Sequence, residues 1–141
     1  GLNFYNGLIN ELIKNKIEPI VTIYHFDLPL NLQKEYGGWK SRKIVKDFQR
    51  YCHVLFTNFG DRVKYWLTIN EQSNMFALPY LLKYKDEVLD EKIKFQMNHH
   101  MMLANAVAIK LAHKMLPNAK IGPAIRVITI LSGNHRNQLM F

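Results

Sequence analysis

The sequence has few of the features that mark secreted or membrane-spanning chains. It contains one cysteine in 141 residues, so it cannot form the internal disulfide framework of a small secreted domain. Its apolar runs are far shorter than the ~20 residues that a membrane-spanning helix needs, and no basic segment followed by an apolar run suggests a signal peptide. We therefore expect a soluble protein of the reducing cytoplasm, with no membrane partner.

The composition is that of one globular unit with an excess of positive charge. Hydrophobic residues make up 48% of the chain, enough for a packed core, and 19 Lys and Arg against 11 Asp and Glu give a net charge of +8. Asp47 and apolar residues at helical spacing interrupt the densest basic cluster, as on a solvated helix face. That cluster comprises Lys40, Arg42, Lys43, Lys46 and Arg50. We therefore expect no nucleic-acid partner.

Hydrophobic periodicity divides the chain into alternating helices and strands. It predicts helices over residues 2–15, 41–59 and 91–116, each with one buried face, and strands over 20–24, 63–69 and 120–125. We expect Ser41 as the N-cap and Gly60 as the C-cap of the middle helix, and a loop through residues 27–38. Residues 75–90 favour neither helix nor strand. This order predicts an α/β fold with parallel strands.

Polar residues follow two of the predicted strands, where parallel β/α folds gather their ligand groups. Tyr24 is followed by His25, and the second strand runs into Asn70 and Glu71. A carboxylate at the end of an apolar strand is partly removed from water, which suits a general acid. Glu71 could equally cap a loop or pair with a lysine, His25 could be a core residue, and Asn70 could belong to a turn.

Other chemistries find less support. His99 and His100 are adjacent and point to different helix faces, and His113 lies too far along to complete a metal site with them. The pair Gly37 and Gly38 lacks the remainder of a phosphate-binding motif, and Cys52 lies on an apolar helix stripe, where a thiol is inert. We expect no metal and no cofactor. Three aromatic residues could form a sugar-stacking surface or belong to the core: Phe26, Tyr36 and Trp39.

The sequence contains the segments IEPIVTIYHFDLPLNLQKEYGGW, FQRYCHVLFTNFGDRVKYWLTINEQ and NHHMMLANAVAIKLAHKMLPNAKIGPAI. These three segments resemble glycoside hydrolase family 1, the family of β-glucosidases and 6-phospho-β-glucosidases. The resemblance covers residues 1 to about 126. It implies a partial (β/α)₈ barrel of about three β/α units, and retaining hydrolysis of β-glycosides by two glutamates.

The resemblance also implies roles for individual residues. Glu71, in TINEQ, corresponds to the general acid/base, Asn70 to the residue that binds the sugar 2-hydroxyl, and His25, in YHFDLP, to a second sugar-binding residue. Phe26 stands where many members carry Trp, which would alter a contact to the sugar. Gln72, together with the segment NAKIGPAI, favours the bacterial 6-phospho-β-glucosidase branch. The implied substrate is a β-glucoside or its 6-phosphate.

The sequence departs from the family pattern in two ways. It has no TENG-type segment with the nucleophile, so we expect this segment alone to be an inactive part of a glycosidase. Residues 127–141 diverge from the family, which suggests a truncated or frame-shifted product. The alternative is a non-catalytic remnant that binds sugar weakly or self-associates through open barrel edges.

Overall fold

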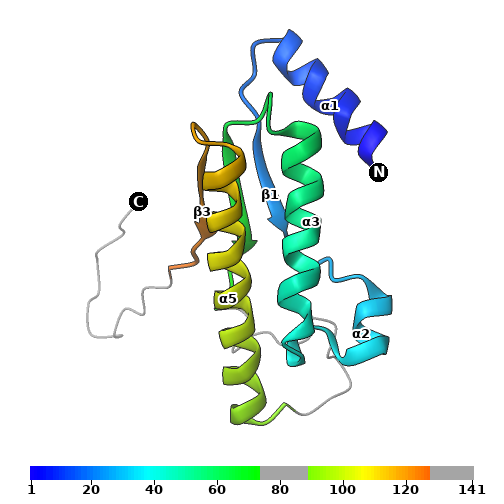
Figure 1. The fold of residues 1–141 in the computed structure, drawn as a ribbon, viewed down its shortest axis with the longest axis vertical. Coiled ribbons are helices and arrows are strands. Elements are labelled where there is room, and N and C mark those ends of the chain that lie inside the picture. The colour runs from blue at the N-terminus through cyan, green and yellow to red at the C-terminus, as the bar shows by residue number, and fades with distance from the viewer. Residues whose placement is uncertain (74–88, 128–141) are drawn as a thin grey trace, which may run out of the picture.

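The computed structural model describes residues 1–73 and 89–127, in which parallel strands alternate with helices (Figure 1). The strands are β1 (Ile20–Tyr24), β2 (Tyr65–Asn70) and β3 (Lys120–Ala124). The helices are α1 (Leu2–Lys14), α2 (Leu30–Tyr36), the 3₁₀ helix η1 (Gly38–Lys40), α3 (Lys43–Phe59) and α5 (Glu91–Met115). The predicted parallel α/β fold is confirmed.

The strands form one open sheet in the order β1-β2-β3, and both pairings are parallel. Ile20 lies opposite Tyr65 in the first pairing, and Tyr65 lies opposite Lys120 in the second. The second pairing becomes irregular between Leu67 and Asn70, opposite the part of β3 that contains Pro123, which has no amide hydrogen for the ladder. The carboxyl ends of all three strands therefore lie along one edge of the fold.

Helices α3 and α5 lie side by side over one face of the sheet (Figure 1). The apolar stripe of α3 is buried as predicted and comprises Ile44, Phe48, Cys52, Leu55, Phe56 and Phe59. Phe56 packs edge-on against Trp66 of β2, with ring centroids 5.0 Å apart. Burial raises the pKa of the Cys52 thiol to about 12, which agrees with an inert core residue.

Helix α5 begins at an N-cap that the sequence pattern did not reveal. The Asp90 side chain accepts a hydrogen bond from the Ile93 amide at 2.7 Å, which satisfies one of the unpaired amides of the first turn. The buried side of the helix includes Met97, His100, Met101, Ala104, Ala108 and Ala112. Three of these are alanines four residues apart, so the helix backbone can approach its neighbours closely.

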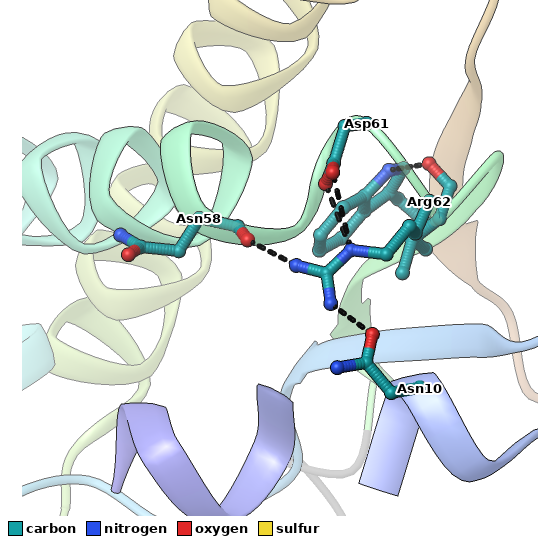
Figure 2. Close-up of polar contacts among 6 residues, drawn as sticks. Asn10, Asn58, Asp61 and Arg62 are labelled. Carbon is teal, nitrogen blue, oxygen red and sulfur yellow. Dashed lines mark hydrogen bonds and ion pairs between the residues drawn. The ribbon is translucent and has the colours of Figure 1, made fainter. Parts of the chain in front are cut away.

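Helix α1 forms where the spacing predicts it, but most of its apolar face is exposed. Ile9 is its one buried residue, so the expectation of a buried face is wrong, because the helix packs against α3 along only a short stretch. Figure 2 shows how Arg62 links this helix to the rest of the fold. The Arg62 guanidinium pairs with Asp61 and donates to the Asn58 carbonyl and to the Asn10 side chain of α1.

Two local expectations differ from the structure between β1 and α3. The segment expected to be a loop contains α2, which ends at Gly37 in the left-handed conformation, and then η1. Arg42, rather than Ser41, is the N-cap of α3, although the Ser41 hydroxyl still accepts from the Lys43 amide at 3.3 Å. The C-cap at Gly60 is confirmed.

The face of the sheet opposite α3 and α5 is covered by no helix of the described ranges 1–73 and 89–127. Trp66 and Thr68 contact the helices, so Tyr65 and Leu67 point the other way, together with Ile20 and Thr22 opposite them. Ile20 is 65% exposed and Tyr65 is 42% exposed. In the same described part of the chain, no helix is long and apolar enough to cross a membrane.

Candidate active site

The structure brings the predicted site residues to one rim of the sheet. Tyr24 at the end of β1 lies opposite Ile69, and Asn70 at the end of β2 lies opposite Ala124 of β3. His25 therefore follows its strand at the level of Asn70, and neighbouring strands are about 4.8 Å apart. Glu71 comes next in the chain and is partly buried, as is Asn70. The parallel order of the strands thus gathers all three residues, as the sequence predicts.

His25 is exposed at this rim, so its alternative interpretation as a core residue is wrong. Its backbone amide donates to Asp27 Oδ1 at 3.0 Å, which shapes the turn after β1. Its ring lies edge-on to Phe26, with the centroids 5.4 Å apart. Phe26 itself has a positive φ of 64°. The imidazole therefore stands at the rim on a tightly turned backbone.

Glu71 adopts a backbone conformation that is uncommon for its residue type. Its φ is 42°, in the left-handed region, where a residue with a Cβ is held at a cost of the order of 1 kcal/mol. Its amide donates to the Ala124 carbonyl at 2.8 Å, beyond the last regular pair of β2 and β3. Such strain occurs most often at functional sites, where neighbouring contacts hold it in place.

The residue after Glu71 is attached to helix α5. Gln72 Nε2 donates to Asn98 Oδ1 at 2.7 Å and to the Asn98 carbonyl at 3.3 Å. This contact was not predicted from the sequence. Asn98 lies 26 residues further along the chain, within α5, and no motif links the two positions.

A buried polar chain lies beneath the rim and connects α5 to the end of β1. Trp39 Nε1 donates to the Tyr24 hydroxyl at 3.1 Å, and the Trp39 carbonyl accepts from His100 Nδ1 at 2.8 Å. A carbonyl can only accept, so Nδ1 carries the proton and Nε2 accepts from the Gln96 side chain at 3.0 Å. Trp39 is 1% exposed and is therefore a core residue, not a sugar-stacking surface.

The remaining candidates lie around α2 and α3. The Tyr36 hydroxyl donates to Asp47, and burial together with Asp47 raises the pKa of this phenol above its usual value. A cavity of about 240 Å³ lies between the end of β1, α2 and α3 and is lined mainly by apolar side chains such as Leu28 and Phe48. Glu71 does not line it. Within residues 1–73 and 89–127, no three His, Cys, Asp or Glu residues are grouped as metal ligands.

The chain matches known proteins across most of its length. A family model described as glycosyl hydrolase family 1 matches residues 1–138. The aryl-phospho-β-D-glucosidase BglC of Bacillus subtilis is 47% identical over 125 residues, which are 88% of this chain and 26% of that protein. The chain thus spans about a quarter of the length of this curated relative.

Solved structures agree with the sequence match. A family 1 β-glucosidase from Thermotoga maritima superposes with a TM-score of 0.80 at 39% identity, over 88% of this chain and 28% of that chain. A glutamate-to-glutamine variant of a rice β-glucosidase, in a covalent complex with glucose, superposes with a TM-score of 0.81 at 33% identity, over 90% and 30% of the two chains. These matches confirm the predicted partial barrel. With a family model over nearly its whole length and the same fold in solved members, the chain belongs to glycosyl hydrolase family 1.

Proposed function

We propose that Glu71 is the general acid/base of a retaining β-glycosidase to which this chain contributes part of the barrel. One observation carries the proposal: within a glycosyl hydrolase family 1 chain, a glutamate stands at the carboxyl end of β2 in a left-handed conformation that the Ala124 carbonyl helps to hold. A carboxyl group at this rim can reach a bound substrate, because the carboxyl ends of barrel strands form the active sites of this fold.

The proposed reaction has two steps. Glu71 first protonates the leaving oxygen while a second carboxylate, roughly 5 Å away, attacks the sugar and forms a covalent intermediate. Glu71 then removes a proton from the water that releases the sugar. The nucleophile would come from a part of the barrel outside the segment that this chain shares with its relatives. The covalent glucose complex of the rice variant supports a mechanism of this kind.

Two neighbours are proposed to bind the sugar. Asn70 would donate to the 2-hydroxyl, and His25 would bind a second hydroxyl group of the same sugar. The exposure of His25 and its position level with Asn70 support this assignment. Hydrogen bonds to the 2-hydroxyl that strengthen in the transition state contribute several kcal/mol to the reaction in enzymes of this type.

The proposed substrate is a 6-phospho-β-glucoside. The support is the 47% identity to BglC, whose name describes an aryl-phospho-β-D-glucosidase, together with Gln72 after the acid/base. A plain β-glucoside is the alternative, supported by the likeness to the Thermotoga maritima β-glucosidase. In a complete barrel that contains this chain, a comparison of kcat/KM for p-nitrophenyl β-glucoside and for its 6-phosphate decides between the two. We expect the 141-residue chain by itself to hydrolyse neither.

The acid/base role is tested in a complete barrel. The 125-residue matching segment of BglC is replaced by the corresponding residues of this chain, and Glu71→Gln is introduced. We expect hydrolysis of unactivated 6-phospho-β-glucosides to fall by about 10²–10⁴-fold, because proton transfer to the leaving group contributes that much. The first step with a dinitrophenyl glycoside, whose leaving group needs no proton, should change little. Azide, which needs no deprotonation, should restore turnover of that substrate.

Glu35→Gln is the matched control, because Glu35 is an exposed glutamate of α2 that is not among the residues proposed to contact the substrate. It should leave both substrate classes unaffected. Equal losses for the two substrate classes in Glu71→Gln, without rescue by azide, would show that Glu71 is not the acid/base.

A non-catalytic role is the second candidate. The uncovered sheet face with exposed Ile20 and Tyr65 favours a chain that self-associates. Weak sugar binding by the 141-residue chain, lost with His25→Ala and accompanied by an inactive chimera, would support this candidate over the first.

A further inference from the structure

The backbone around Glu71 is held from two sides. On one side, the Glu71 amide donates to the Ala124 carbonyl of β3 at 2.8 Å. On the other side, the Gln72 side chain donates to both the side-chain oxygen and the carbonyl of Asn98 on α5, at 2.7 and 3.3 Å. Gln72 and Asn98 are both partly buried, so water competes less for this contact than it does at an open surface.

The left-handed conformation of Glu71 depends on such contacts. A strained φ of 42° persists only where surrounding structure over-determines it. The hydrogen bond to the Ala124 carbonyl fixes the backbone amide of Glu71. The contact with Asn98 fixes Gln72, the residue after Glu71. Without the second contact, the peptide after Glu71 can rotate toward an unstrained conformation, which would turn the carboxyl group away from its position at the rim.

We propose that Asn98 is a positioning residue for Glu71, acting through the Gln72 side chain. The inference rests on the proposed acid/base role of Glu71, because positioning matters to catalysis only if Glu71 transfers the proton. Proton transfer requires the donor within hydrogen-bonding reach of the leaving oxygen. A side chain on the rigid α5 helix is well suited to fix this geometry.

The chain offers a matched control on the same helix. Asn105 lies two turns further along α5, and its side-chain oxygen accepts a hydrogen bond from the Thr68 hydroxyl in the middle of β2. Asn105→Ala therefore removes an amide contact between α5 and β2 without touching Gln72. Asn98→Asp keeps a side-chain oxygen acceptor for Gln72. Asn98→Ala removes the side-chain acceptor and leaves only the longer bond to the backbone carbonyl of residue 98, whereas Gln72→Met removes both bonds.

Amide hydrogen exchange, measured by NMR on the 141-residue chain, tests the inference directly. We expect Asn98→Ala and Gln72→Met to speed exchange of the Glu71 amide by about tenfold, the effect of losing one hydrogen bond, and to leave the Trp66 amide unchanged. Asn98→Asp should retain the slow exchange. Asn105→Ala should leave the Glu71 amide as slow as in the parent chain.

Two results would overturn the inference. Unchanged exchange at Glu71 in both Asn98→Ala and Gln72→Met would show that the contact does not hold this backbone. Equal acceleration at Glu71 and Trp66 would show a general loss of stability. Gln72→Met keeps the test decisive if a change within α5 prevents folding.

A second readout separates this inference from the proposed function. In the chimeric barrel, Asn98→Ala should lower kcat about tenfold with KM little changed, and Asn98→Asp should restore it. If Glu71→Gln shows no acid/base phenotype, the proposed function fails while the exchange result for Asn98 still stands. If kcat is unaffected by Asn98→Ala although Glu71→Gln behaves as expected, the positioning role alone is wrong.

Discussion

At the scale of single residues, Gly60 shows how closely two elements approach at the amino-terminal end of the sheet. It ends α3 in an ordinary helical conformation, so no left-handed geometry requires a glycine here. A Cβ built on Gly60 would lie 2.3 Å from Leu116 Cδ2 and 2.5 Å from the Phe56 carbonyl oxygen. The absence of a side chain is therefore what lets Leu116, which follows α5, pack against the end of α3.

We expect Gly60→Ala to destabilise the chain by about 1–3 kcal/mol, the usual cost of forcing an extra methyl group into a packed contact. The free energy of unfolding in urea, followed by circular dichroism, measures the effect. Gly7→Ala is the control, because a Cβ there meets nothing within 4 Å and lies inside α1. Alanine should stabilise that helix by about 0.5–1 kcal/mol. A similar small gain at Gly60 would contradict the packing argument.

At the scale of elements, His100 joins α5 to η1 and, through Trp39, to the end of β1. It is 3% exposed and hydrogen-bonded at both ring nitrogens. Its neighbour His99 is exposed on the same helix, as the prediction of different faces requires. The two histidines therefore allow a buried and an exposed imidazole to be compared within one turn of α5.

We expect His100→Ala to destabilise the chain by about 2–4 kcal/mol, because it leaves a buried carbonyl of Trp39 without its donor and creates a cavity. His99→Ala should change the stability by less than about 0.5 kcal/mol. Urea unfolding and the near-ultraviolet circular dichroism of Trp39 report both effects. Equal changes in the two variants would mean that the buried chain does not hold the elements together.

The elements differ in how far their sequences predict them. The long helices α3 and α5 were predicted because their apolar stripes extend over several turns, and the strands because β-branched runs end at polar residues. Helix α2 was missed because seven residues carry little periodicity, and a helix that short depends on tertiary contacts rather than propensity. The rim position of Glu71 followed from the parallel order, whereas its strained backbone and the contact between Gln72 and Asn98 depend on partners distant in sequence.

Several predictions made from the sequence stay open. Most of the segment that favoured neither helix nor strand, residues 75–88 of 75–90, lies outside the described residues. The proposed boundary at residue 126 and the divergent tail 127–141 stay predictions, because residues 128–141 also lie outside them. The expected roles of Glu71, Asn70 and His25 likewise stay predictions until the chimera is assayed.

At the scale of the whole molecule, helices of the described residues cover one face of the sheet and leave the opposite face open. Helices α3 and α5 bury one face of the sheet, while Ile20 and Tyr65 are exposed on the opposite face. In the described residues, β1 and β3 each have a side that pairs with no strand. Apolar faces and unpaired strand edges both favour association between copies of a chain.

We therefore expect the 16.6 kDa chain to self-associate, with a sedimentation coefficient that rises with protein concentration. Ile20→Lys, which places a charge on the uncovered face, should shift the chain toward the monomer. Leu30→Lys is the control, because Leu30 is 58% exposed on α2, away from this face. A chain that stays monomeric at all concentrations, or responds equally to both substitutions, would contradict this prediction.

The hydrogen bond between the Glu71 amide and the Ala124 carbonyl affects the order in which parts of the sheet fold. Each strand pairs with a partner that is separated from it by at least one whole helix, so the sheet consists of non-local contacts, which form slowly. During synthesis, β1 and β2 can meet before β3 has left the ribosome. The backbone at Glu71 then gains its β3 partner only after residue 124 emerges, which makes the rim one of the last parts of the described fold to mature.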